Sequence, residues 1–271
     1  VSFNLKYILL PLGISFFTFQ QVSFVIDSYR GDVPDYSLLD YALFVCFFPQ
    51  LIAGPIVLHD EIVPQFADKT NKTFSYENFS RGLYAFSLGL AKKVLIADVL
   101  GNFANAGFAD IPNLNSTAAI VSMLSYTLQI YFDFSGYCDM ATGIGYMFNI
   151  KLPMNFNSPY KAATVKELWQ RWHITLSRFF VRYVYIPMGG SRKGKVRTLF
   201  NVFFIFLLSG FWHGANWTFI VWGILHGMCQ VIERFFGLQK SSQNKIVRFV
   251  RVIVTFLVVN FAWKKMVHFR E

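Results

Sequence analysis

Residues 198–236 read TLFNVFFIFLLSGFWHGANWTFIVWGILHGMCQVIERFF, two apolar runs that meet at a Trp-His-Gly turn. A helix that spans a membrane needs about 20 predominantly apolar residues, and each run approaches that length with few charged side chains. Only helices and closed barrels satisfy every backbone polar group inside lipid. The length of these runs favours helices, so the stretch predicts an all-α protein embedded in a membrane.

The composition of the whole chain agrees with that prediction. Of 271 residues, 54% are hydrophobic, 19% are aromatic and 15% are charged, and the mean hydropathy is +0.40. A soluble domain of this size needs more charge at its surface. The formal net charge of +10 is interpreted as basic cytoplasmic loops beside anionic lipid headgroups, and nucleic-acid binding is not expected.

Several segments of the chain are long and apolar enough to be candidate spans. They are residues 5–26, 41–58, 83–100, 117–148, 198–212, 215–236 and 247–264. The fourth is too long for one crossing, and we expect Gly136, Gly143 and Gly145 to break it. Loops rich in Lys and Arg, at 161–197 and 234–251, alternate with loops that have few, which predicts a multi-pass protein with the basic loops in the cytoplasm.

No repeat or low-complexity segment divides the chain, so one membrane domain is predicted over residues 1–271. The chain begins at Val1 and shows no small-residue cleavage site after a short apolar run, so a signal peptide is not expected. The sequence is interpreted as an internal piece of a longer protein.

Residues 155–197 are too polar to span a membrane and too aromatic for a free loop. A helical wheel predicts an interfacial helix whose apolar face carries Trp169, Trp172, Leu176, Phe180 and Tyr183. Its basic side has two open interpretations, lipid anchoring or docking of an anionic donor, for which the candidates are Lys166, Arg171, Arg178 and Arg182. The wheel places His173 on the apolar face, where a titratable ring is expected to have a hydrogen-bond partner or a functional role.

The turn around His213 is the strongest candidate for a functional site. The run before it, residues 198–212, covers roughly 22 Å as a helix, less than the roughly 30 Å of a hydrocarbon core. We therefore expect the turn to lie below the outer surface, where irregular backbone is tolerated only if it lines a cavity. Trp212, His213 and Gly214 are accordingly predicted to line one, and Gly214 lets another group approach the backbone closely.

Other polar side chains are expected at the same depth. One face of the following helix carries Asn216, Gly223, His226, Gln230 and Glu233. Earlier segments contribute Lys92, Lys93, Asp98, Asp133, Ser135 and Asp139. The further candidates for lining the cavity are Asn216, His226, Asp133 and Asp139.

A histidine in such a cavity suits a general base that removes a proton from a hydroxyl. The sequence has no Gly-x-Ser-x-Gly nucleophile elbow and no cysteine beside His213. Direct attack of an acceptor on an activated acyl group is therefore favoured over a covalent enzyme intermediate. The spacing of His213, His226 and Cys229 does not suit a metal ion, and no metal site is expected.

Four blocks in order carry a family resemblance. They are FFPQLIAGPIV (47–57), YFDFSGYCDMATGIGYM (131–147), NFNSPYKAATVKELWQRWHITLSRFF (155–180) and SGFWHGANWTFIVWGILHG (209–227). Together they resemble the membrane-bound O-acyltransferase family, and within it the bacterial alginate O-acetyltransferase branch, relatives of the membrane protein that D-alanylates teichoic acids. The resemblance covers nearly the whole chain, although family members are longer at both ends.

The resemblance implies a ring of transmembrane and re-entrant helices around a central tunnel in a bacterial cytoplasmic membrane. It places the family's catalytic histidine at His213 and a second histidine at His173. It also implies a cytoplasmic thioester donor, either an acyl-coenzyme A or an acidic acyl carrier protein, with no bound cofactor. The acyl group would pass to an exported polysaccharide hydroxyl or to an extracytoplasmic partner acyltransferase.

Two other classes of function stay open from the sequence. The same intramembrane polar residues could line the path of a transporter or flippase of a polysaccharide or lipid-linked substrate. Alternatively, the chain could be a non-catalytic membrane component of a polymer synthesis complex.

Overall fold

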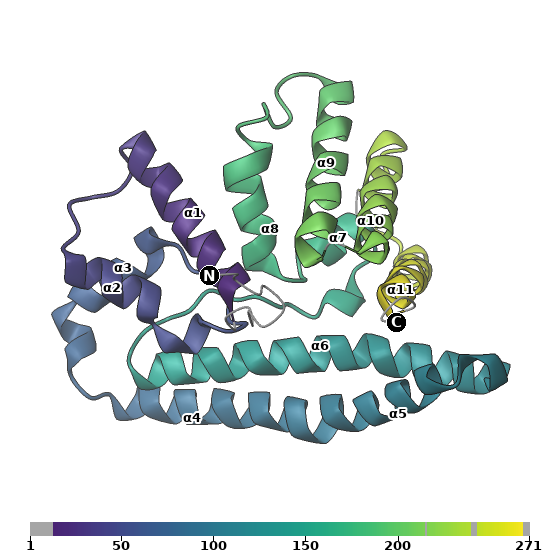
Figure 1. Cartoon of the computed structure of the whole chain (residues 1–271), viewed down its shortest axis with the longest axis horizontal. Helices are drawn as coiled ribbons and strands as arrows, with labels where there is room; N and C mark the ends of the chain where they lie inside the picture. The colour runs from purple at the N-terminus through teal and green to yellow at the C-terminus, as the bar shows by residue number, and fades with distance from the viewer. Residues whose placement is uncertain (1–12, 215, 240–242, 268–271) are drawn as a thin grey trace, which may run out of the picture. The chain divides into compact units, whose positions relative to one another are not determined.

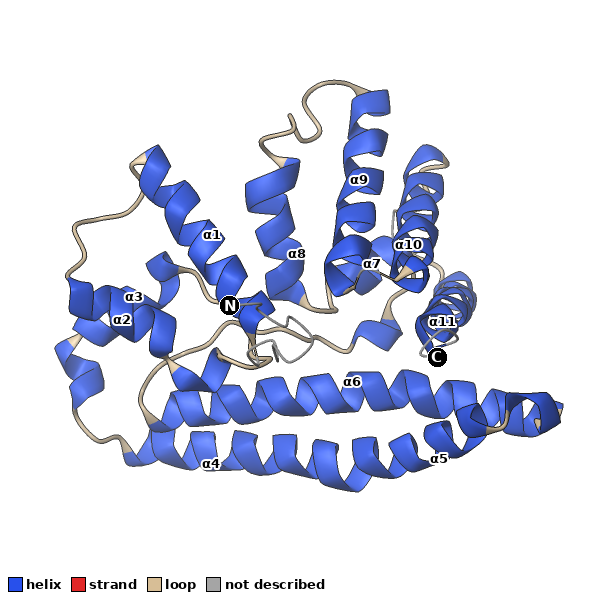
Figure 2. Ribbon diagram, viewed as in Figure 1, coloured by secondary structure: helices blue, strands red, loops and turns tan. Residues whose placement is uncertain are grey.

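A computed structural model describes residues 13–214, 216–239 and 243–267. Within those ranges the regular elements are all helices, and no strand occurs (Figure 2). The predicted all-α class is therefore confirmed. Packing divides the chain into two compact units, residues 1–90 with 136–153 and residues 91–135 with 154–271.

The first unit contains three complete helices and parts of two others (Figure 1). They are α1 (Ile14–Arg30), α2 (Leu38–Cys46), α3 (His59–Ala67), α4 (Tyr76–Ala91) up to residue 90, and the C-terminal end of α6 (Ser116–Met147). The start of α2 is set by a capping box, in which the Ser37 side chain accepts from the backbone N–H of Asp40 and the Asp40 carboxylate accepts from that of Ser37.

The second unit holds every histidine singled out from the sequence. Its helices are α5 (Asp98–Ala109), the N-terminal part of α6, α7 (Val165–Trp169), α8 (Ile174–Phe180), α9 (Lys195–His213), α10 (Trp217–Phe235) and α11 (Lys245–Val267). A π-helical turn, Lys92–Ala97, leads into α5, and another, Val181–Tyr185, continues α8. The core is largely aromatic, with Trp169, Trp172, Trp222 and Trp263 buried together.

The predicted break in residues 117–148 is wrong, because α6 is one helix of 32 residues. Gly136 and Gly143 make room for α4 rather than ending the helix, and Gly145 faces Ile150 and Leu152. A Cβ atom on Gly143 would lie 2.6 Å from the carbonyl oxygen of Gly82, and one on Gly89 would lie 2.5 Å from that of Gly136. The two backbones therefore touch, which is how small residues bring helices together in membranes. Figure 1 shows the two helices side by side.

Among the described residues, two helices are long and apolar enough to cross a membrane, Lys195–His213 and Lys245–Trp263, and a shorter apolar segment covers Leu38–Gln50. They correspond to the predicted spans 198–212, 247–264 and 41–58. The other predicted spans also fall on helices where the structure describes them, but they do not meet the same criterion of length and hydropathy. The first part of the predicted span 5–26 lies outside the described residues.

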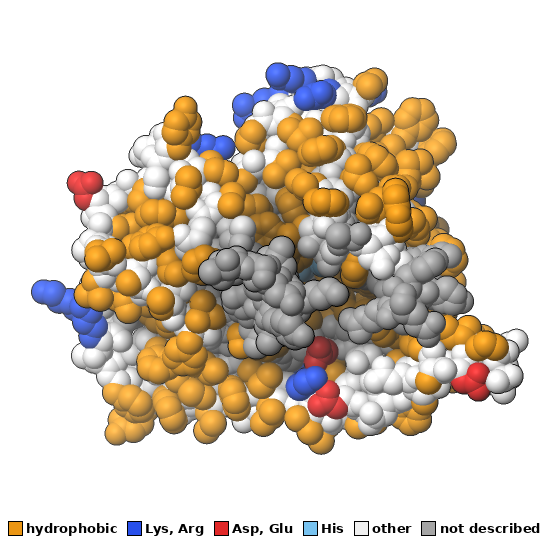
Figure 3. All heavy atoms as spheres, viewed as in Figure 1, with side chains coloured by type: hydrophobic (Ala, Val, Ile, Leu, Met, Phe, Trp, Pro, Cys, Tyr) orange, Lys and Arg blue, Asp and Glu red, His pale blue; other side chains and the backbone are white. Residues whose placement is uncertain are grey.

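Hydrophobic side chains cover much of the face that Figure 3 shows. On α10 and α11, for example, Phe235 is 71% exposed, Phe249 is 66% exposed and Leu257 is 55% exposed. An apolar surface this extensive is a liability in water and suits contact with lipid acyl chains.

Candidate active site

The Trp-His-Gly turn joins α9 to α10, and the helix that leads into it is longer than predicted. The predicted helix 198–212 is too short, because α9 has 19 residues, from Lys195 to His213. It begins directly after Gly194, so Lys195 and Arg197 add a polar first turn to the apolar run. At about 1.5 Å per residue the helix covers roughly 28 Å, close to the thickness of a hydrocarbon core. Helix length therefore no longer places the turn below the outer surface.

Two glycines hold α9 and α10 in direct backbone contact below this turn. A Cβ atom on Gly210 would lie 2.4 Å from the carbonyl oxygen of Phe219, and one on Gly223 would lie 2.5 Å from that of Phe206. At the turn itself, a Cβ atom on Gly214 would lie 2.6 Å from the ring of Phe219. The small residues of this segment thus bring the side chains of α10 up against His213.

His213 is the last residue of α9 and is half-buried. Its ring centroid lies 4.6 Å from that of Trp212 and 5.0 Å from that of Trp222, whose ring meets it edge-on at 81°. Phe219 stacks on it at 6.2 Å. The imidazole is therefore held among aromatic rings and still retains access from outside the core, as a proton-transferring group requires.

His226 lies on α10 and is 1% exposed. The indole Nε1 of Trp169 is 3.2 Å from its Nδ1. Because an indole N–H can only donate, Nδ1 of His226 is the acceptor and the ring proton sits on Nε2. Trp169 thus fixes His226 as a neutral donor.

His173 is also buried, but its backbone is unusual. It has φ 45° and ψ 54°, a left-handed conformation that a non-glycine residue rarely adopts, at the N-cap of α8. Asn155 holds the segment, because its carbonyl accepts from the N–H of Ile174 and its side-chain Oδ1 accepts from both the N–H and the hydroxyl of Thr175. The Nδ1 atom of His173 lies 3.2 Å from the same Oδ1.

The three histidines lie in the same unit. The ring centroid of Trp222 lies 5.0 Å from that of His213 and 4.9 Å from that of His226, and His173 is near enough to His213 to feel its charge. Sequence reasoning proposed His213 and His173 as a pair and named His226 as a neighbour of the cavity, and the structure brings all three together in the second unit. Such a set can take up a proton, hold a ring in one tautomer and donate a hydrogen bond to a reacting oxygen.

The remaining cavity candidates take part in other interactions. Asn216 caps α10, since its Oδ1 accepts from the N–H of Thr218 at 3.1 Å. Asp133 pairs with Lys93 at 2.6 Å, and the same ammonium contacts Asp98 at 2.7 Å, in a half-exposed triad. Asp139 belongs to the first unit. Within the described residues, no group of three or more His, Cys, Asp or Glu side chains could hold a metal ion.

The predicted interfacial helix over the basic stretch is wrong, because the segment breaks between α7 and α8 at the left-handed His173. The five side chains that the wheel placed on the apolar face are all buried, but Arg171 lies in the turn before α8 and shares no helix face with Arg178 and Arg182. Lys166 borders a cavity of about 260 Å³ whose other lining residues include Trp169, Phe206, Tyr185 and Arg234.

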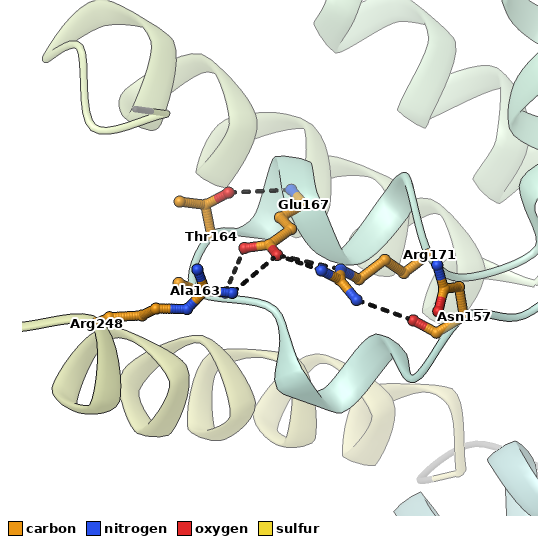
Figure 4. Close-up of polar contacts among 6 residues, drawn as sticks. All are labelled: Asn157, Ala163, Thr164, Glu167, Arg171 and Arg248. Atoms are coloured by element: carbon orange, nitrogen blue, oxygen red, sulfur yellow. Dashed lines mark hydrogen bonds and ion pairs between the residues drawn. The ribbon is translucent and has the colours of Figure 1, made fainter. Parts of the chain in front are cut away.

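Arg171 is bound within the protein. Its Nε and Nη2 atoms lie 3.1 and 2.8 Å from Oε1 of Glu167, and its Nη1 atom donates to the carbonyl oxygen of Asn157 (Figure 4). Arg248 of α11 reaches the same carboxylate oxygen at 3.7 Å. Glu167 therefore links α7, the preceding loop and α11.

A buried polar network in the first unit was missed from the sequence. Nε2 of His59 lies 3.3 Å from Oδ2 of Asp27, and the hydroxyl of Tyr36 lies 3.2 Å from Nδ1 of His59. Asp27 is 0% exposed and His59 is 1% exposed. Burial and the neighbouring carboxylates of Asp60 and Asp40 raise the pKa of Tyr36, which keeps its hydroxyl protonated. The three residues lie in different segments, so no local spacing signals the contact.

Known proteins resemble this sequence over most of its length. The model of the membrane-bound O-acyltransferase family matches residues 3–263. A peptidoglycan O-acetyltransferase of Helicobacter pylori is 47% identical over 96% of the chain and 54% of its own length. A probable alginate O-acetylase of Pseudomonas putida is 46% identical over 96% of the chain and 53% of its own length.

A more distant relative is a teichoic acid D-alanyltransferase of Bacillus subtilis, 26% identical over 93% of the chain and 67% of its own length. The chain thus spans about half the length of the two O-acetylating relatives that it matches.

Proposed function

The chain belongs to the membrane-bound O-acyltransferase family, and on this premise we propose that it transfers an acyl group, most simply acetyl, from a thioester to a hydroxyl of a cell-envelope polysaccharide, with His213 as general base. The observation that carries the proposal is the position of His213. It ends α9, is half-buried among aromatic rings, and contacts Trp222, whose ring lies 4.9 Å from that of the buried His226.

The reaction needs one proton carrier. His213 removes the proton of the acceptor hydroxyl while the hydroxyl oxygen bonds to the carbonyl carbon of the thioester. The carbon–sulfur bond then breaks, and the leaving thiolate takes the proton from His213. His173 assists as the neighbouring neutral ring, and the helices form a ring around the tunnel in which donor and acceptor meet.

The donor is a cytoplasmic thioester, acyl-coenzyme A or an acidic acyl carrier protein. Support comes from the positive charge of residues 161–197 and from the cavity beside Lys166, which combines apolar walls with the cationic side chains of Lys166 and Arg234. A pantetheine arm with its phosphate needs this combination. Arg178 and Arg182 would add to the attraction of an anionic carrier from outside the cavity.

The acceptor side is extracytoplasmic, in a bacterial cytoplasmic membrane that the protein crosses several times. The names of the relatives support an envelope polymer as the final acceptor, since they act on peptidoglycan or alginate. The acyl group reaches the polymer directly or through a partner acyltransferase. Membrane lipids cover the exposed hydrophobic surface of α10 and α11.

The test is a His213→Ala substitution in the full-length protein, followed by measurement of acyl esters on the exported polysaccharide. We expect ester formation to be lost while polymer export and membrane expression stay normal. Unchanged esterification would overturn the assignment of His213. Loss of polymer export itself would favour a transporter.

A further inference from the structure

The aromatic cluster behind His213 contains two N–H groups that the proposed proton transfer does not use. Trp222 and His226 lie four residues apart on α10, and therefore on one face of it, with ring centroids 4.9 Å apart. Trp222 is 0% exposed and His226 is 1% exposed. Their neighbours are Trp169, Phe206 and Trp263, so the surroundings are apolar.

Both groups are hydrogen-bond donors without an acceptor. Since Trp169 donates to Nδ1 of His226, the proton of His226 is on Nε2. Among the described residues, neither this Nε2–H nor the Nε1–H of Trp222 has a hydrogen-bond partner. A third buried indole N–H, that of Trp263, also has no hydrogen-bond partner among the described residues, but it neighbours the hydroxyl of Tyr160. Buried donors are nearly always paired in native proteins, so two unpaired donors side by side indicate a ligand atom that accepts from them.

The chemistry of the pair limits what that atom can be. Both donors are neutral, and an apolar site without a cation disfavours a permanent anion such as a phosphate. A carbonyl oxygen is neutral when it binds and gains negative charge only in the transition state, where fixed N–H donors stabilise it most. The ring centroids of Trp222 and His213 lie 5.0 Å apart at an interplanar angle of 81°, so an oxygen bound by Trp222 lies close to the proposed base.

We propose that Trp222 and His226 are the oxyanion-binding pair of the acyl-transfer site, donating from Nε1 and Nε2 to the carbonyl oxygen of the acyl thioester. The inference rests on the proposed function. As the acceptor oxygen bonds to the carbonyl carbon, the π electrons move onto the carbonyl oxygen, which the two N–H groups hold. The carbonyl re-forms as the carbon–sulfur bond breaks, and the thiolate takes the proton that His213 removed. Trp169 is a positioning residue, because it acts only through the tautomer of His226.

Kinetics of the full-length protein in membranes test the pair. Trp222→Phe and His226→Leu each remove one donor and keep an apolar side chain, and we expect each to lower kcat by about 100-fold with little change in KM. His226→Gln, which offers an amide N–H in a similar position, should retain more activity than His226→Leu. Trp172→Phe is the control, since Trp172 is buried in the same cluster but contributes neither donor.

Infrared spectroscopy gives a readout that does not depend on turnover. Acetyl-coenzyme A labelled with ¹³C at its carbonyl is bound to the His213→Ala variant, and its carbonyl stretch is compared with that in His213→Ala/Trp222→Phe. A lower frequency in the first variant is expected, because hydrogen bonds weaken the carbonyl bond. Retained kcat in both Trp222→Phe and His226→Leu, or an equal stretch in both backgrounds, overturns the oxyanion pair. If His213→Ala remains active, the proposed function fails instead.

Discussion

The Oδ1 atom of Asn155 lies 3.2 Å from Nδ1 of His173, and it is an acceptor because the backbone N–H of Thr175 also donates to it. Nδ1 of His173 must therefore carry the ring proton, which leaves the lone pair on Nε2. Trp169 imposes the opposite tautomer on His226. Two buried histidines near His213 are thus held as opposite tautomers, His173 with its acceptor nitrogen at Nε2 and His226 with its donor nitrogen at Nε2.

Substitution of Asn155 should therefore change how activity depends on pH. Asn155→Asp places a carboxylate beside Nδ1, which stabilises the protonated ring and raises the pKa of His173. A protonated His173 cannot accept at Nε2, so we expect activity to be lost on acidification at a pH about 1–2 units higher than in the wild-type protein. Rates of ester formation measured across pH 5–8 would show the shift.

Asn155→Ala removes the acceptor without adding charge. We expect ester formation to fall about 10–100-fold at all pH values, because the tautomer and orientation of His173 are no longer fixed. Equal pH profiles for the wild-type protein and Asn155→Asp would argue against the orienting role.

Much of the fold could be predicted from hydropathy, and the errors of that prediction have identifiable causes. Apolar segments indicated helices because a backbone inside lipid must satisfy all its hydrogen bonds internally. The glycines of residues 117–148 could be interpreted in two ways, because glycine can weaken a helix or let another helix approach it closely. The structure shows that Gly143 and Gly136 allow close approach, since they face Gly82 and Gly89 of α4.

The candidate site could be proposed from the sequence where its signal is local. The Trp-His-Gly turn identifies His213 within three residues of sequence. The setting of His226 was not predictable, because its partner Trp169 is 57 residues away along the chain. The helical wheel placed His173 correctly on the buried side but missed the helix break there, because Asn155, 18 residues earlier, holds the chain in a left-handed turn that no helical periodicity encodes.

The contact between α4 and α6 can be tested by adding one methyl group. Gly143→Ala puts a Cβ atom 2.6 Å from the backbone oxygen of Gly82, which cannot move aside, so we expect a loss of about 1–3 kcal/mol in stability. Gly101→Ala is the control, because its Cβ would meet the end of the flexible Gln129 side chain. Thermal unfolding in detergent should show a lower Tm for Gly143→Ala only. An equal Tm for both variants would contradict the close contact.

Removal of the buried carboxylate of Asp27 should destabilise the first unit. Asp27→Ala leaves Nε2 of His59 buried without the acceptor 3.3 Å away, at a cost of about 1–3 kcal/mol. Asp32→Ala removes an exposed carboxylate five residues later and should leave Tm unchanged. If the two variants unfold at the same temperature, the network contributes nothing to stability.

Lys166 and Arg171, two candidates for docking the donor, should respond differently to substitution. Arg171 is held by Glu167 and by the carbonyl of Asn157, so Arg171→Ala should mainly lower Tm. Lys166 borders the cavity that α7, α8, α9 and α10 line, so Lys166→Ala should raise KM for an anionic thioester several-fold and leave Tm near that of the wild-type protein. The increase in KM should shrink as salt is added, because ions screen a charge–charge attraction over roughly 10 Å at 0.1 M. Initial rates with acetyl-coenzyme A at 50 and 500 mM NaCl measure both effects. A KM for Lys166→Ala that equals the wild-type value at low salt would remove this lysine from the donor site.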